Sequence, residues 1–77
     1  MEFEQIVSSN LESAAFDAQT GAIVVRFQSG SAYRYPNCDR ALWEKFRATF
    51  DGKKSSASKF MAANLKPRAY ERIDDWK

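Results

Sequence analysis

The stretch from Gly21 to Pro36 constrains the fold of this chain more than any other part of the sequence. Every second residue from position 23 to position 27 is large and apolar, which is the period of a half-buried strand. Ser29-Gly30 interrupts the pattern, and residues 32–35 resume it with side chains that favour strands. The stretch is therefore predicted to be a β-hairpin.

Two registers of this hairpin are open, and they place its tyrosines differently. A two-residue turn at Ser29-Gly30 sets Tyr33 opposite Arg26 and Tyr35 opposite Val24. A one-residue slip would move every side chain of the strand to the other face, so the core can suit only one register.

The second register has a three-residue loop at positions 28–30, with Gly30 in the left-handed conformation that such loops need. The two tyrosines then face Val25 and Ile23, and the two arginines of the hairpin share the opposite face. We favour this register because it gives an apolar inner face and a basic outer face.

A further strand is predicted before the hairpin, at residues 11–16. Its alternation places Ala14 and Phe16 on one face and Leu11 and Ala15 on the other. A loop with Asp at its start and Gly at its end then leads into the hairpin. Together these segments predict a three-stranded antiparallel meander.

A first helix is predicted after the hairpin, with Asn37 or Asp39 as its N-cap and Gly52 at its C′ position. Arg40 and Glu44, four residues apart, are expected to pair on its solvent side. The apolar residues of this segment share one helical face: Leu42, Trp43, Phe46 and Phe50.

A second helix is predicted to begin at Ser55 or Ser56 and to end before Pro67, whose ring clashes with helix continuation. Its apolar face consists of Ala57, Phe60, Met61 and Leu65. Pro67 can also open a third helix, which would align Tyr70, Ile73 and Trp76.

Residues 1–77 are thus predicted to form one α+β domain, a three-stranded antiparallel β-meander followed by two or three helices packed on one face. No apolar run approaches the roughly 20 residues of a membrane span. The N-terminus is acidic, unlike a secretory or organelle leader. Cys38 is the single cysteine, so we expect a reducing cytoplasm.

The net charge of +2 is unevenly distributed along the chain. Residues 1–25 carry four acidic residues and no lysine or arginine, whereas residues 26–68 carry ten basic residues and three acidic ones. The middle of the chain is therefore basic enough to attract a phosphate backbone, although a solvated surface of mixed charge accounts for it equally simply.

The sequence contains few of the residues on which enzyme catalysis usually depends. The absence of histidine removes the usual general base, the usual activator of serine or cysteine, and the commonest metal ligand. One cysteine without histidine leaves no zinc site, and the three glycines form no phosphate-binding motif. We predict no enzyme activity and no cofactor, and Cys38 is expected to be a small buried side chain.

Two segments are candidates for binding. On the sheet, tyrosines flanked by arginines resemble the surfaces on which RNA-binding modules stack unpaired bases, although a domain this small more often needs such large side chains in its core. At the start of the second helix, free backbone amides, serine hydroxyls and lysines could seat a phosphate, or simply form a capped helix. The candidate nucleic-acid-binding residues are Arg26, Tyr33, Arg34, Tyr35, Lys53, Lys54 and Lys59.

The chain also resembles a known family, the KTSC domains, over most of its length. The resemblance rests on Ser8-Ser9-Asn10-Leu11 and Ala14-Ala15-Phe16-Asp17, on Ile23-x-Val25-x-Phe27-x-x-Gly30-x-x-Tyr33-x-Tyr35, and on Ser56, Phe60, Met61, Leu65, Lys66 and Tyr70. Phe16 stands where the family usually has tyrosine, Ser58 and Ala62 stand where it has Gly and Asn, and the stretch around residues 50–54 is longer than usual.

The family is named for a domain at the C-terminus of some lysyl-tRNA synthetases, and it also occurs as small stand-alone proteins of bacteria and phages. The resemblance implies the α+β fold and suggests RNA, single-stranded or tRNA-like, as a partner. We therefore expect a small non-enzymatic binding module for RNA. The alternative is a protein–protein adaptor, or a regulator of a larger host or phage complex. No membrane or small-molecule substrate is expected.

Overall fold

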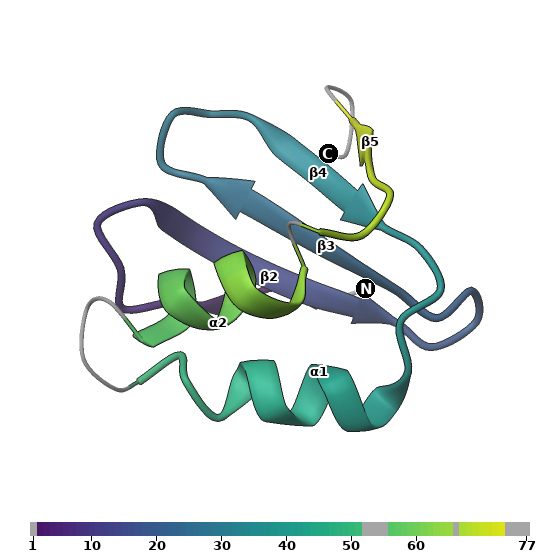
Figure 1. Cartoon of the computed structure of the whole chain (residues 1–77). Coiled ribbons are helices and arrows are strands. Elements are labelled where there is room, and N and C mark those ends of the chain that lie inside the picture. Colours follow the sequence, from purple (N-terminus) through teal and green to yellow (C-terminus); the bar gives the residue numbers. More distant parts are fainter. Residues whose placement is uncertain (1, 52–55, 66, 74–77) are drawn as a thin grey trace.

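The structure, a computed structural model, describes residues 2–51, 56–65 and 67–73. The described residues form five strands and two helices (Figure 1). In chain order these are β1 (Glu4–Gln5), β2 (Leu11–Asp17), β3 (Ala22–Phe27), β4 (Ala32–Tyr35), α1 (Arg40–Arg47), α2 (Ser56–Asn64) and β5 (Glu71–Arg72).

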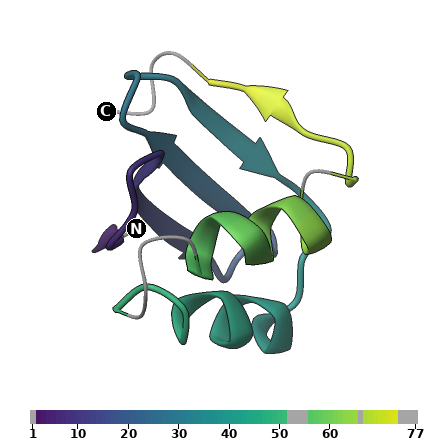
Figure 2. The ribbon, with the colours of Figure 1, turned by 60° about the vertical axis from the view of Figure 1, so that its left-hand side comes forward.

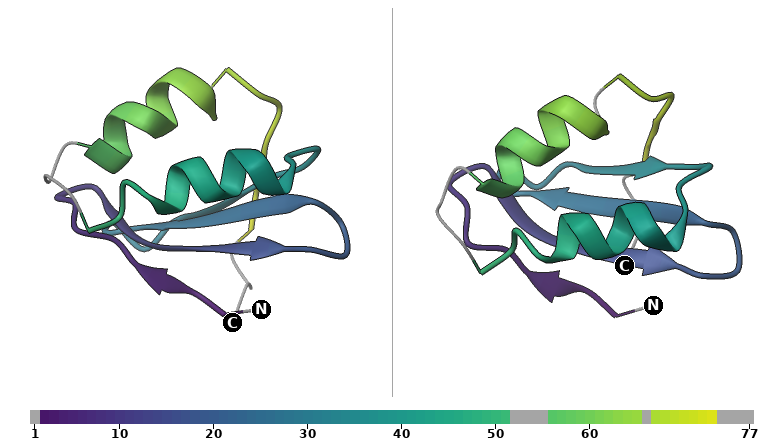
Figure 3. Two further views of the ribbon diagram at one scale, coloured as in Figure 1. Left: turned by 90° about the horizontal axis from the view of Figure 1, so that it is seen from below. Right: turned by 60° about the horizontal axis from the view of Figure 1, so that its bottom comes forward.

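The strands form one antiparallel sheet in the order β1-β2-β3-β4-β5. Both helices lie on the same face of this sheet, as the two views of Figure 3 show. We call the helix-covered face the inner face and the opposite face the outer face. The predicted α+β class, with an antiparallel sheet and two helices, is confirmed.

The predicted number of three strands is wrong, because two further strands lie at the sheet edges. β1 pairs with β2, and β5, which follows the helices in sequence, returns to pair with β4 (Figure 2). Each added strand is two residues long. A segment this short carries no alternation to read, and only its partner strand makes it a strand.

The β3–β4 hairpin adopts the favoured register with the three-residue loop. Val25 pairs with Tyr33 and Ile23 with Tyr35. The Phe27 N–H donates to the Ser31 carbonyl, which closes the loop, and Gly30 has a φ of 97°. Ile23, Val25 and Phe27 of β3 therefore share the inner face with both tyrosines, whereas Val24 lies opposite Arg34 on the outer face.

Leu11 lies on the inner face, contrary to the alternation read from the sequence. The register of β2 against β3 shifts between Leu11, which pairs with Phe27, and Ser13, which pairs with Arg26. The extra residue, Glu12, makes a β-bulge that returns Leu11 to the core side. Leu11 is 1% exposed there.

Helix α1 supplies the aromatic part of the core. Asp39 is its N-cap and accepts a hydrogen bond from the Leu42 N–H, which decides between the two predicted caps. Trp43, Phe46 and Phe50 are buried and meet edge to face, with Phe46 and Phe50 ring centroids 4.8 Å apart. The predicted pair of Arg40 and Glu44 is present at 3.7 Å.

Helix α1 ends earlier than predicted, whereas α2 ends where it was expected to. α1 ends at Arg47, and residues 48–51 continue as turns, so Phe50 enters the core from outside the helix. α2 ends at Asn64, before Pro67 as predicted, and buries Ala57 and Met61, and Leu65 is buried just after the helix. The predicted caps Gly52 and Ser55 lie outside the described residues.

The predicted third helix after Pro67 is wrong for residues 67–73. Glu71 and Arg72 form β5, and the Ile73 N–H donates to the Ala32 carbonyl. The helical spacing of Tyr70 and Ile73 is overridden because the edge of β4 offers unpaired backbone groups. Trp76, the last member of that pattern, lies outside the described residues.

Candidate functional site

The inner face of the sheet carries a surface groove beside the helices, with a cavity volume of about 390 Å³. We call it the tyrosine groove. It lies at the end of β3 and β4 where the hairpin loop joins them. Tyr70, which directly precedes β5, forms part of its wall. Its lining consists of Phe27, Ser29, Ser31, Tyr33, Tyr35 and Tyr70.

The four rings of the groove contact one another in sequence. The Phe27 and Tyr33 centroids are 5.5 Å apart, and Tyr70 lies 5.4 Å from Tyr33 and 5.7 Å from Tyr35. The interplanar angles are 85°, 90° and 43°, so none of these pairs is a parallel stack. Tyr70 is 58% exposed, which leaves much of its ring open to solvent.

Tyr35 anchors the inner end of this array. It is 3% exposed and belongs to the core, whereas Tyr33 is half-buried against it. Burial, with a smaller contribution from the neighbouring Tyr70 and Tyr33, raises the pKa of Tyr35 to about 12. Its phenol therefore remains protonated at neutral pH and can donate a hydrogen bond.

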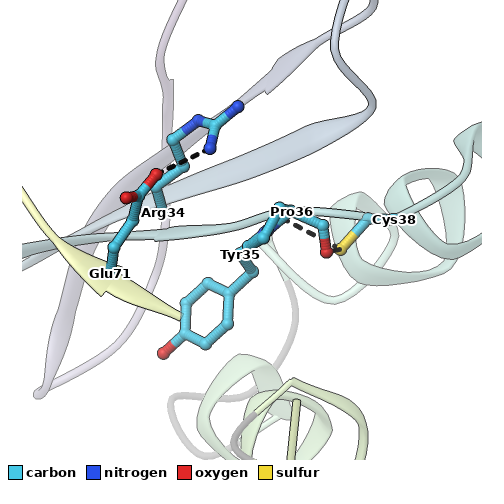
Figure 4. A network of polar contacts seen from close by, with 5 residues as sticks. All are labelled: Arg34, Tyr35, Pro36, Cys38 and Glu71. Atoms are coloured by element: carbon cyan, nitrogen blue, oxygen red, sulfur yellow. Dashed lines mark hydrogen bonds and ion pairs between the residues drawn. The ribbon is translucent and has the colours of Figure 1, made fainter. Parts of the chain in front are cut away.

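The arginines predicted to flank the tyrosines lie on the other face of the sheet. Arg34 and Tyr35 project from opposite sides of β4, as Figure 4 shows. Arg26 lies on the outer face with Arg34, because the partners of both in the register are outer-face residues. The structure thus separates the arginines from the tyrosines, and a stacking surface flanked by both is not present.

The outer-face arginines are paired with carboxylates. Arg26 lies 2.9 Å from Glu12 and Arg34 lies 2.7 Å from Glu71. The Arg26 guanidinium also lies 5.7 Å from the centroid of the Phe3 ring. The outer face is therefore less basic than the hairpin sequence alone suggests, since each arginine is matched by a glutamate from a neighbouring strand.

The charge imbalance along the sequence is partly compensated in space. Arg47 of α1 lies 2.7 Å from Glu4 of β1, and hydrogen bonding to this carboxylate raises the pKa of the guanidinium. Three of the ion pairs, those of Arg26, Arg34 and Arg47, join the basic middle of the chain to its acidic ends. These exposed or half-exposed pairs add little stability, but they reduce the field that a phosphate would feel.

The second predicted site is described only in part. Lys53 and Lys54 lie outside the described residues, and Lys59 is exposed on α2. Ser58 forms a hydrogen bond of 3.1 Å with the Ser8 hydroxyl, which itself accepts from the Asn10 and Leu11 N–H groups. Ser58 therefore ties α2 to the start of β2.

Groups suited to covalent or metal chemistry are scarce in the described part of the chain. Cys38 is buried, as predicted, and its thiol donates to the Tyr35 carbonyl at 3.3 Å. Burial raises the pKa of this thiol, which disfavours the reactive thiolate. Within residues 2–51, 56–65 and 67–73, His, Cys, Asp and Glu form no cluster suited to a metal ion. No helix in these ranges could span a bilayer.

Sequence reasoning identified Tyr33 and Tyr35 but missed the rest of the groove. Phe27 could have been included, because the favoured register already placed it beside Tyr33 on the inner face. Tyr70 was assigned to a helix, and nothing in its local sequence indicates that it meets tyrosines more than thirty residues earlier.

The comparisons with known proteins agree with the resemblance seen in the sequence. A family model for the KTSC domain matches residues 7–70. The crystal structure of a KTSC domain protein from Yersinia pestis is similar, with a TM-score of 0.81 and 16% sequence identity, over 94% of this chain and 96% of that one. At this identity the likeness concerns the fold alone, and no curated protein matches the chain. Because the family model spans most of its residues, the chain belongs to the KTSC domain family.

Proposed function

We propose that this domain is a non-enzymatic binding module for single-stranded RNA and that RNA binds at the tyrosine groove. The observation that carries the proposal is an open groove walled by three tyrosines and a phenylalanine. Stacking of a base on an aromatic ring contributes about 1–3 kcal/mol, and it is available only to unpaired bases.

Cations around the groove support a nucleic-acid ligand. Arg72 pairs with Tyr33 across β4 and β5, so it projects from the same face of the sheet. Arg68, two residues before Tyr70, donates to the backbone carbonyls of Asn64 and Asn37. Among the described residues no carboxylate forms an ion pair with Arg68, so its charge is available to a phosphate. The association of the family with lysyl-tRNA synthetases points to the same ligand.

A protein–protein adaptor is the second candidate function, and one observation favours it. The lining of the groove has no charged residue, and four arginines elsewhere are paired with glutamates. Tyrosine-lined, uncharged grooves also suit extended peptides. In a pull-down from lysate with and without nuclease, protein partners that survive nuclease treatment would favour the adaptor.

Titration with RNA tests the proposal directly. We expect a single-stranded oligonucleotide to bind more tightly than a duplex of the same length, measured by fluorescence anisotropy. The plot of log affinity against log salt should have a slope of only about −1.4, because Arg68 and Arg72 are the two cations assigned to the phosphates. The Arg68→Ala/Arg72→Ala double variant should flatten that slope, because it removes both of these cations.

The matched variant Arg34→Ala separates the groove from the outer face. We expect it to leave RNA affinity within about twofold of the wild type, because Arg34 lies on the opposite face and is paired with Glu71. Failure of the wild-type protein to bind any RNA at about 10 mM salt, where the Debye length is about 30 Å and charge attraction is little screened, would contradict the proposal.

A further inference from the structure

We propose that the tyrosine groove takes one unpaired, uncharged nucleobase, which packs against Tyr70 and is recognised through hydroxyl groups. The inference rests on the proposed function. It specifies in addition which part of the RNA enters the groove and which residues hold that part. It also assigns no direct role to the arginines of the hairpin.

The size of the groove limits what can enter it. Its volume of about 390 Å³ lies near the lower end of the range for small-ligand pockets. A planar ring system fits such a space, whereas a helix or a nucleic-acid duplex does not. A strand of RNA would therefore place one base in the groove and leave its sugar and phosphates outside.

The uncharged lining also favours the base over the phosphate. The lining consists of tyrosines, serines and one phenylalanine, and it contains no Asp, Glu, Lys or Arg. An ionised group would lose its hydration in this setting without gaining a counter-ion. A base is neutral at pH 7 and has large apolar faces, so it matches the lining, and a phosphate does not.

Hydroxyl groups supply the polar contacts. The lining of the groove provides the hydroxyl groups of Tyr33, Tyr35, Tyr70, Ser29 and Ser31. Tyr35 is only 3% exposed, and its hydroxyl makes no hydrogen bond to the described residues, although its oxygen is not among their fully buried unpartnered atoms. A hydroxyl both donates and accepts. This group can therefore pair with either a carbonyl or an amino group on the edge of a base.

Tyr70 is the residue whose removal best isolates stacking. It contacts Tyr33 and Tyr35 but is 58% exposed, so its ring is held in place while one side stays accessible. Truncating an exposed side chain costs the fold little. The Tyr70→Ala variant should thus remove one wall of the groove and leave the domain folded.

The test measures RNA binding for three variants and one control. The probes are octauridylate, octaadenylate and a duplex of equal length, and the variants are Tyr70→Ala, Tyr70→Phe and Tyr35→Phe. We expect Tyr70→Ala to lose at least about fivefold in affinity for the single strands and Tyr70→Phe to keep it. Tyr35→Phe should weaken both single strands by a similar factor, about threefold, because its hydroxyl can pair with either base. The control Val7→Ala truncates another exposed apolar residue, outside the groove, and should match the wild type.

The outcomes separate this inference from the proposed function. Equal binding of octauridylate by the wild type and by folded Tyr70→Ala would overturn this inference and the placement of RNA at the groove, and would leave RNA binding itself standing. No RNA binding by the wild type would overturn both, and so would a nuclease-resistant protein partner that is lost with Tyr70→Ala. Titration with uridine and adenosine distinguishes a free nucleoside ligand from an RNA strand. A nucleoside that binds as tightly as the octamer would mean that the ligand of the groove is the free nucleoside.

Discussion

Phe46→Ala is expected to remove much of the stability of this domain. Phe46 is fully buried, and its ring lies 4.8 Å from that of Phe50 and 5.5 Å from that of Phe60, between the two helices. Truncating such a ring costs about 3–5 kcal/mol. A domain of this size has a total stability of only about 4–12 kcal/mol.

Thermal melting followed by circular dichroism measures this effect. We expect the Phe46→Ala variant to melt at least about 12 °C below the wild type. Lys45→Ala, an exposed change on the same helix, should alter the free energy of unfolding by no more than about 0.5 kcal/mol. A Phe46→Ala variant that melts within 3 °C of the wild type, which is under about 1 kcal/mol, would mean that the two helices do not enclose this ring.

Gly21→Ala is expected to be the second most damaging change. Gly21 has a φ of 71°, and a Cβ built there would lie 2.8 Å from the carbonyl oxygen of Cys38. The Cys38 N–H donates to the Gly21 carbonyl at 2.7 Å, so two backbone segments meet at this point. A backbone neighbour cannot rotate away as a side chain can, and the β2–β3 turn or the segment before α1 has to move.

Gly30→Ala provides a matched control. Gly30 also has a positive φ, 97°, but a Cβ there would meet no atom within 4 Å. Both substitutions incur the conformational cost of a left-handed residue, about 1–2 kcal/mol, and only Gly21→Ala adds the steric clash. In urea denaturation Gly21→Ala should cost at least about 2 kcal/mol more than Gly30→Ala. Equal costs would show that the contact with Cys38 relaxes freely.

The parts of the fold that could be predicted are those with a strong local pattern. The alternation of β3 and β4 defined the hairpin, and the position of Gly30 selected the correct register. The spacing of Trp43 and Phe46 identified α1 in the same way. In each case a periodicity agreed with a turn or cap residue at its end.

The parts that could not be predicted depend on distant partners. β1 and β5 form because β2 and β4 offer open edges. Each is only two residues long, so its own sequence has no pattern that predicts a strand. The bulge at Glu12 is equally invisible, since a strict alternation fits the isolated strand just as well. Tertiary pairing also replaced the helix that the spacing of Tyr70 and Ile73 suggested.

The candidate site shows the same division. The confirmed register placed Tyr33 and Tyr35 on the inner face and the arginines on the outer one. Local sequence could not predict the ion pairs of the arginines, because the partners are far away in the chain. Glu4 is 43 residues from Arg47, and Glu71 is 37 residues from Arg34. The approach of Tyr70, which forms a groove with the buried Tyr35 and the half-buried Tyr33, could not be read from local sequence either.

The central claim is that the ligand enters the tyrosine groove, and intermolecular NOEs test it most directly. A complex of the wild-type protein with octauridylate, the isotope-labelled protein being observed by NMR, should show NOEs from the ring protons of Tyr70 and Tyr33 to uracil H5 and H6. The side-chain signals of Arg26 and Arg34, on the outer face, should stay unchanged. NOEs or shifts confined to the outer-face arginines or to Lys59, with the tyrosine rings unaffected, would contradict the account.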